Sequence, residues 1–134
     1  MTYLIDSSVW IDFLRRGGSE GVHSFVKQAL REQAAAYTCV TAMELLAGCR
    51  NNEEQTVIRE LFGLSRHLPV EWPHWELAAD LLKHLHKGGH KVPLSDVLIA
   101  AVAVEKRIQL ACRDKHFELI RKHGGHHFEF RFIE

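Results

Sequence analysis

Short apolar runs alternate along the chain with longer segments in which apolar residues recur every three or four positions. The short runs predict strands at residues 2–6, 36–40, 67–71, 108–112 and 127–133. The longer segments predict helices at residues 8–15, 20–33, 41–49, 53–64, 73–85, 95–106 and 115–123. Because strands and helices interleave, the pattern predicts an α/β domain whose parallel sheet is covered by helices on both faces.

Length and composition are those of an ordinary globular domain. A chain of 134 residues with 46% apolar residues predicts a single domain over residues 1–134 with a substantial core. No apolar run approaches the ~18 residues of a membrane span, and no signal peptide is recognisable, so we expect no membrane association. The 17 basic and 17 acidic side chains balance, so an RNA ligand would require a local basic patch.

The cysteines indicate a reducing compartment. Cys39, Cys49 and Cys112 are odd in number and far apart, and no CxxC motif occurs. This usage predicts free, mostly buried thiols in a cytoplasmic protein, and argues against a disulfide framework or a zinc site.

Acidic residues stand near the ends of three predicted strands and at the start of a buried helix. Asp6 ends the first strand in YLIDSSVWIDFL, and Glu44 follows the second in TAMELLAG. Asp114 follows the fourth in ACRDKHF, and Asp96 opens the helix in PLSDVLIAA. A parallel sheet would bring these positions to one edge, where ligands bind in open α/β sheets.

Four carboxylates in one cleft would repel each other strongly. A pair ~4 Å apart costs about 4 kcal/mol at an effective dielectric near 20. The carboxyl groups would take up protons or separate unless a cation held them together. Mg²⁺ or Mn²⁺ is the natural ion for oxygen ligands, and it can activate water for attack on a phosphodiester.

Each acid also has a purely structural interpretation at the start of a helix. Asp6 and Asp114 would cap the helices that follow them, Thr41 and Glu44 fit a capping box, and Ser95 would cap the helix in which Asp96 occupies the first turn. From the residues alone, both interpretations stay open.

The motifs LIDSSVWIDFL, TAMELLAG, SDVLIAAVA and CRDKHF, in this order and spacing, resemble those of PIN-domain ribonucleases. The resemblance extends over nearly the whole chain and is strongest to the VapC-type toxins of bacterial toxin–antitoxin pairs. It implies a three-layer α/β/α sandwich with a central, mainly parallel sheet, an acidic Mg²⁺ or Mn²⁺ site, and endonucleolytic cleavage of RNA. It also implies a homodimer and a cognate antitoxin whose tail wraps the toxin near its cleft.

The family's acidic positions correspond to Asp6, Glu44, Asp96 and Asp114, and Ser8 corresponds to a small hydroxyl residue that supports the first aspartate. By this resemblance Asp6 and Asp96 bind the metal directly, while Glu44 binds through water or orients the attacking water. Asp114 would complete the shell or hold a second ion. Attack by water would leave a 5′-phosphate and a 3′-hydroxyl.

One position departs from the family pattern. Family members often carry a second acid near the last site residue, in a pattern like D-x-D-F, whereas this chain has Asp114-Lys115-His116-Phe117. This change favours one metal over two. His116 either takes part in the metal shell or hydrogen-bonds a ligand or phosphate.

Basic residues near the predicted cleft are candidates for RNA contact. The segment KHLHKGGHK at 83–91 has three lysines, three histidines and no acid. It is either a positive loop beside the cleft or a solvated helix end whose cations complement the helix dipole. The RNA-binding candidates are Arg15, Lys87, Lys91, Arg113 and Lys115.

Two other functions fit parts of the sequence. A catalytically inactive PIN-like module that binds RNA or protein would tolerate histidine at position 116. A receiver-like signalling domain would also carry an acidic Mg²⁺ pocket, but it needs adjacent acids after an early strand, where this chain has Asp6 alone.

Overall fold

The computed structural model describes all residues from 1 to 134, with five strands and seven helices in alternation. The strands are β1 (Tyr3–Ile5), β2 (Ala35–Tyr37), β3 (Arg66–His67), β4 (Gln109–Cys112) and β5 (Phe130–Phe132). The helices are α1 (Ser7–Leu14), α2 (Glu20–Arg31), α3 (Cys39–Ala47), α4 (Asn52–Gly63), α5 (Trp72–Lys87), α6 (Leu94–Lys106) and α7 (His116–His123). No helix is long and apolar enough to cross a bilayer.

The strands form one sheet in the order β3-β2-β1-β4-β5, and every neighbouring pair is parallel. The chain first winds outward from β1 to β3, then returns across α5 and α6 to place β4 on the other side of β1. The direction of winding therefore reverses between β1 and β4. In open α/β sheets such a switch point opens a crevice at the carboxyl ends of the strands.

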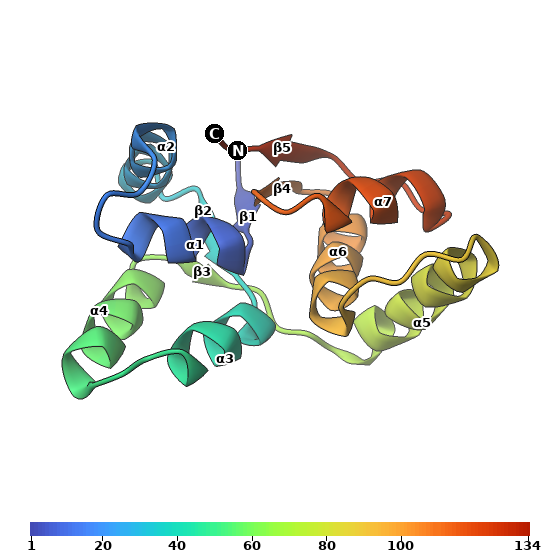
Figure 1. Cartoon of the computed structure of the whole chain (residues 1–134), viewed down its shortest axis with the longest axis horizontal. Helices are drawn as coiled ribbons and strands as arrows, with labels where there is room; N and C mark the ends of the chain where they lie inside the picture. Colours follow the sequence, from blue (N-terminus) through green and yellow to red (C-terminus); the bar gives the residue numbers. More distant parts are fainter.

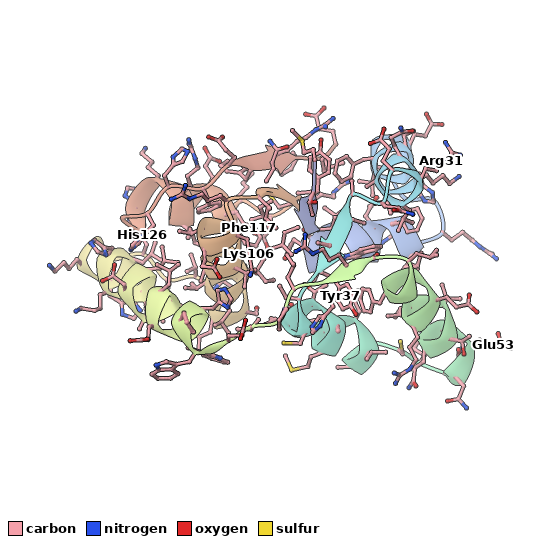
Figure 2. The ribbon with its side chains drawn as sticks, turned by 180° about the vertical axis from the view of Figure 1, so that it is seen from behind. Arg31, Tyr37, Glu53, Lys106, Phe117 and His126 are labelled. Atoms are coloured by element: carbon pink, nitrogen blue, oxygen red, sulfur yellow. The ribbon has the colours of Figure 1, made fainter.

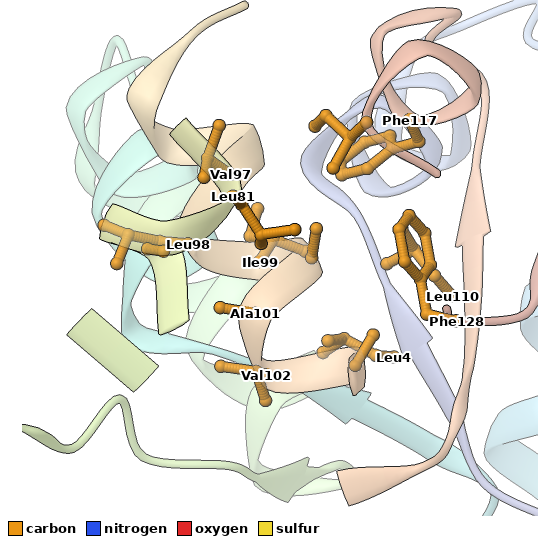
Figure 3. Close-up of a cluster of buried hydrophobic side chains, with 14 of the residues drawn as sticks. Leu4, Leu81, Val97, Leu98, Ile99, Ala101, Val102, Leu110, Phe117 and Phe128 are labelled. Atoms are coloured by element: carbon orange, nitrogen blue, oxygen red, sulfur yellow. The ribbon is translucent and has the colours of Figure 1, made fainter. Parts of the chain in front are cut away.

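Alternate strand residues bury into two separate cores, which makes the molecule a three-layer sandwich as predicted. Leu4 and Leu110 belong to the core under α5, α6 and α7, and Figure 3 shows them packed with Ile99 and Phe117. Ile5 and Ala111 face the opposite way, into the core under α1, α2 and α4. Figure 1 shows the two helical layers on either side of the sheet.

Several predicted strand boundaries were wrong, and at β2 the cause is a side-chain cap. β2 ends at Tyr37, and the Thr38 side chain caps α3 by accepting a hydrogen bond from the Thr41 N–H. Helix α3 therefore begins at Cys39, and the capping box expected between Thr41 and Glu44 is absent. The strand predicted at 67–71 is instead the two-residue β3, which begins one residue earlier at Arg66, and the strand predicted at 127–133 shortens to β5.

Two smaller expectations also fail. Helix α6 begins at Leu94 after Pro93, which fixes an extended φ of −60° but offers no side-chain cap, so Ser95 lies inside the helix. All three cysteines are free as predicted, but only Cys112 is buried.

Candidate metal centre at the sheet switch point

Two hydrogen bonds join the chain at and just beyond the carboxyl ends of β1 and β4. The backbone N–H of Asp6 donates to the carbonyl oxygen of Ala111 at 2.9 Å. Two residues further along each segment, the backbone N–H of Arg113 donates to Ser8 Oγ at 3.0 Å. Residues more than a hundred positions apart in sequence are thereby held side by side at the switch point.

Ser8 fixes the orientation of the first aspartate. Its hydroxyl donates to Asp6 Oδ2 at 2.6 Å, and its backbone N–H donates to the same oxygen at 3.1 Å, so Asp6 caps α1 as one interpretation expected. The other carboxylate oxygen, Asp6 Oδ1, is buried and has no hydrogen-bond partner. The cap accounts for one oxygen of Asp6 and leaves the second available to a ligand.

Glu44 reaches the same region from α3. Its Oε1 accepts a hydrogen bond of 2.8 Å from the buried Ser7 hydroxyl, which is at the first position of α1. Burial is the main cause of the raised pKa of Asp6, and the charge of Glu44 adds a smaller rise, which shows that Glu44 lies in the neighbourhood of Asp6. Glu44 is therefore held by tertiary contact rather than in a local cap.

Asp96, Asp114 and His116 form a compact group of donor atoms. His116 Nδ1 lies 2.9 Å from Asp96 Oδ2 and 2.9 Å from Asp114 Oδ1. One donor atom from each of the three side chains lies within 4.8 Å of the others, a spacing that fits one metal ion. Asp114 Oδ1 also accepts the His116 N–H at 2.9 Å and so bonds the first turn of α7.

Burial and repulsion between carboxylates both disfavour the ionised forms of Asp6 and Asp96. Removal from water raises the pKa of Asp6 above its ordinary value, although hydrogen bonds from Ser8 and Ser7 offset part of that rise. The pKa of Asp96 rises to about 6, mainly through burial and next through the negative charge of Asp6. Without a cation, the site therefore disfavours full ionisation of its own acids.

These residues fit a divalent metal ion. Asp96 from α6, Asp114 from the end of β4 and His116 from α7 supply two hard carboxylates and one imidazole nitrogen within 4.8 Å of one another. The unpartnered buried oxygen of Asp6 is an acceptor without a donor, which costs free energy unless a ligand satisfies it. A cation would supply that interaction and remove the repulsion that raises the pKa of Asp96.

The raised pKa of Asp96 makes the metal-free protein lose stability as pH rises. Its unfolded value is 3.8 and its folded value about 6, so the fold favours the protonated form, and stability present below pH 4 is lost as pH rises through 6. Allowing for solvent screening, the loss should be about 2 kcal/mol. Urea unfolding in the presence of chelator at pH 4.5 and 7.5 should show this loss of stability in the parent protein. Asp96→Asn should not show it, because asparagine does not ionise. An equal pH response in both proteins would contradict it.

Of the five candidates for RNA contact, one is held by an ion pair and four are exposed. Arg113 NH1 lies 3.4 Å from Asp12 Oδ2, and the same oxygen accepts the Ser19 N–H at 2.9 Å. Arg113 is thus tied to α1, partly exposed, rather than extended toward solvent. The exposed cations are Arg15, Lys87, Lys91 and Lys115.

Sequence reasoning missed two contributors to the site. Ser7 positions Glu44, and the buried Asp12 positions Arg113. Asp12 carries a usable signal, because it is an acid within the apolar run VWIDFL. Ser7 carries none, since its role arises only when α3 packs against α1.

Comparison with known proteins places this geometry in one family. The model of the PIN domain matches residues 3–123. Ribonuclease VapC10 of Mycobacterium tuberculosis is 31% identical over 108 residues, which cover 81% of this chain and 79% of that protein. VapC ribonuclease Mb1587 of Mycobacterium bovis is 29% identical over 123 residues, covering 89% and 91%.

Among solved structures, DNA-bound VapBC from Salmonella typhimurium matches with a TM-score of 0.82 at 14% identity, covering 98% of each chain. FitAcB from Neisseria gonorrhoeae matches with a TM-score of 0.77 at 23% identity, covering 97% of each chain. These likenesses confirm the PIN-like α/β fold. The chain therefore belongs to the PIN-domain family, in its group of VapC ribonucleases.

Proposed function

We propose that this chain is a Mg²⁺- or Mn²⁺-dependent endoribonuclease that acts in the cytoplasm as the toxin of a VapC-type toxin–antitoxin pair. The observation that carries the proposal is the donor group of Asp96, Asp114 and His116, with the charge of Asp6 acting on Asp96 and one oxygen of Asp6 buried and unpartnered. Membership of a family of VapC ribonucleases gives RNA as the substrate class.

Each of the proposed site residues would have a separate role in hydrolysis. Asp6 and Asp96 would hold the cation, which neutralises the phosphate and activates water for attack. Glu44, fixed by Ser7, would orient that water toward phosphorus. Asp114 would complete the cation's shell, and Ser8 would keep Asp6 in place.

Cations at the rim would hold the RNA backbone. Lys115 follows Asp114 beyond β4, and Arg15 follows α1. Arg113 would contact RNA only by exchanging its ion pair with Asp12 for a phosphate. Lys87 and Lys91 flank the loop between α5 and α6, which leads to Asp96. Such contacts are electrostatic and sequence-independent, so they would position the RNA without selecting a base.

A groove beside the acids would receive the antitoxin. It has a volume of about 360 Å³ between α1, α3 and α4, and its lining includes Ile11, Leu14, Arg15 and Glu44. Ile11 and Leu14 are large apolar residues left exposed, as is typical of a surface that a protein partner covers. Because Glu44 belongs to both the groove and the acidic site, a bound tail would cover the entrance to the site.

Exposed apolar side chains would likewise support a homodimer. Large residues are exposed on α3, on α5 and at the start of α6, namely Met43, Trp72, Trp75 and Leu94. A second copy of the chain would remove them from water.

The chemistry of the RNA ends tests the proposed function. The purified protein with Mg²⁺ or Mn²⁺ should leave 5′-phosphate and 3′-hydroxyl ends, because water rather than the ribose hydroxyl attacks phosphorus. Ligation-based end mapping before and after phosphatase treatment distinguishes these from other ends. A 2′,3′-cyclic phosphate would contradict the mechanism.

Two variants separate cleavage by this site from contamination or simple binding. Asp6→Asn, purified identically, should lose the cleavage, whereas Glu53→Gln should retain it. Figure 2 shows Glu53 at the outer end of α4. RNA binding without any metal-dependent cleavage would instead identify an inactive binding module.

A further inference from the structure

We propose that His116 binds the metal through Nδ1, and that this nitrogen makes the site select Mn²⁺ over Mg²⁺. The inference rests on the proposed function for the presence of a metal, and it adds the identity of one ligand and of the preferred ion. It concerns the position at which this chain departs from the all-acid pattern.

The spacing of the donors is that of neighbouring ligands around one ion. In an octahedral shell with bonds of about 2.1 Å, adjacent donor atoms lie about 3.0 Å apart. His116 Nδ1 lies 2.9 Å from an oxygen of Asp96 and 2.9 Å from an oxygen of Asp114. The Nδ1–Asp96 contact is a hydrogen bond in the metal-free protein, and an ion bound among the three donors would take the place of its proton without a change in their spacing.

The ring is held there by the fold. His116 is the first residue of α7, and its own N–H bonds Asp114 Oδ1. The next residue, Phe117, is completely buried in the core that Figure 3 shows. The fold therefore fixes the backbone from which the imidazole reaches Asp96 and Asp114.

A second observation independently indicates a ligand at this place. Asp6 is 3% exposed, and its Oδ1 has no hydrogen-bond partner. The charge of Asp6 is a smaller cause than burial of the raised pKa of Asp96, so the Asp6 carboxylate is near enough to act on this group of donors. An ion bound between Asp6 and this group would give the buried Asp6 oxygen a partner and would connect Asp6 with the three other donors.

Nitrogen changes which ion the site prefers. Mg²⁺ prefers oxygen ligands in near-ideal octahedral geometry and gives up its waters reluctantly. Imidazole suits transition metals, and Mn²⁺ accepts both carboxylate and imidazole donors. Replacing one carboxylate by a neutral imidazole also removes a negative charge, which weakens the attraction for the harder ion.

The opposite role for His116 is that of an internal cation. As imidazolium it would pair with Asp96 and Asp114 and fill the place of the metal, because both nitrogens would then be donors. This alternative predicts that metal binding becomes tighter when His116 is removed. The two roles therefore give opposite results for the same substitution.

Electron spin-echo envelope modulation on Mn²⁺ bound to the full chain tests the inference directly. The parent protein and the control His86→Asp should show ¹⁴N modulation from an imidazole ligand, and His116→Asp should lose it. Titration calorimetry with Mn²⁺ and Mg²⁺ should show the Mn²⁺-to-Mg²⁺ affinity ratio falling at least tenfold in His116→Asp. His116→Gln replaces that variant if circular dichroism shows it unfolded.

The other possible results distinguish a failure of the His116 inference from a failure of the proposed function. Bound Mn²⁺ without ¹⁴N modulation, an unchanged affinity ratio in His116→Asp, or tighter Mn²⁺ binding in His116→Gln would overturn the inference while leaving the nuclease intact. No binding of either ion by the parent protein would overturn the proposed function as well.

Discussion

Replacing Asp96 by asparagine should reduce metal-dependent RNA cleavage by about a thousandfold, equivalent to ~4 kcal/mol of transition-state stabilisation. Asparagine keeps the shape of the side chain but removes the negative charge that would hold the cation. The same substitution should stabilise the metal-free protein at pH 7, because it removes a buried charge whose pKa burial and Asp6 raise to about 6.

Measured together, kcat/KM on a defined RNA and urea unfolding in chelator distinguish this effect from damage to the fold. Glu53→Gln is the matched control, an exchange of acid for amide at an exposed position on α4. It should leave both quantities close to those of the parent. Retained activity in Asp96→Asn would remove this residue from the proposed site, and lost stability would show that its charge supports the fold.

Replacing Trp10 by alanine should lower the free energy of unfolding by about 3–5 kcal/mol. Trp10 is completely buried in α1, and its ring meets Phe62 edge to face at 5.7 Å. Its indole N–H donates to the Ile5 carbonyl oxygen at 3.2 Å, so alanine would also leave that buried acceptor without its donor. Because Asp6 lies between Ile5 and α1, metal affinity should weaken too.

Equilibrium urea unfolding gives the size of this effect, and Leu64→Ala is the control. Leu64 is 65% exposed directly after α4, so its truncation should change stability by no more than about 0.5 kcal/mol. Equal losses for the two variants would contradict the assignment of Trp10 to the core.

Much of the fold follows from local pattern. The alternation of short apolar runs with amphipathic segments predicts the order of all twelve elements, and the acids near strand ends predict where they meet. Asp6 illustrates why two interpretations of one residue need not compete. One of its oxygens caps α1, as a local rule expects, and the other is buried without a partner and stays available to a ligand.

The rest depends on contacts that no local pattern records. Glu44 fits a capping box in sequence, yet its partner is Ser7, which is 37 residues away. Arg113 has the sequence context of a phosphate ligand, but Asp12 holds it. Both contacts form only when helices pack against the sheet, so the orientation of these side chains is set by tertiary structure.

The central claim is that one divalent ion relieves the repulsion among acids brought together at the switch point. The most direct measurement is an anomalous difference map from crystals of the protein soaked in Mn²⁺. We expect a single strong peak within bonding distance of Asp6 and Asp96. A pocket without a peak, in crystals of protein that still cleaves RNA, would contradict the claim.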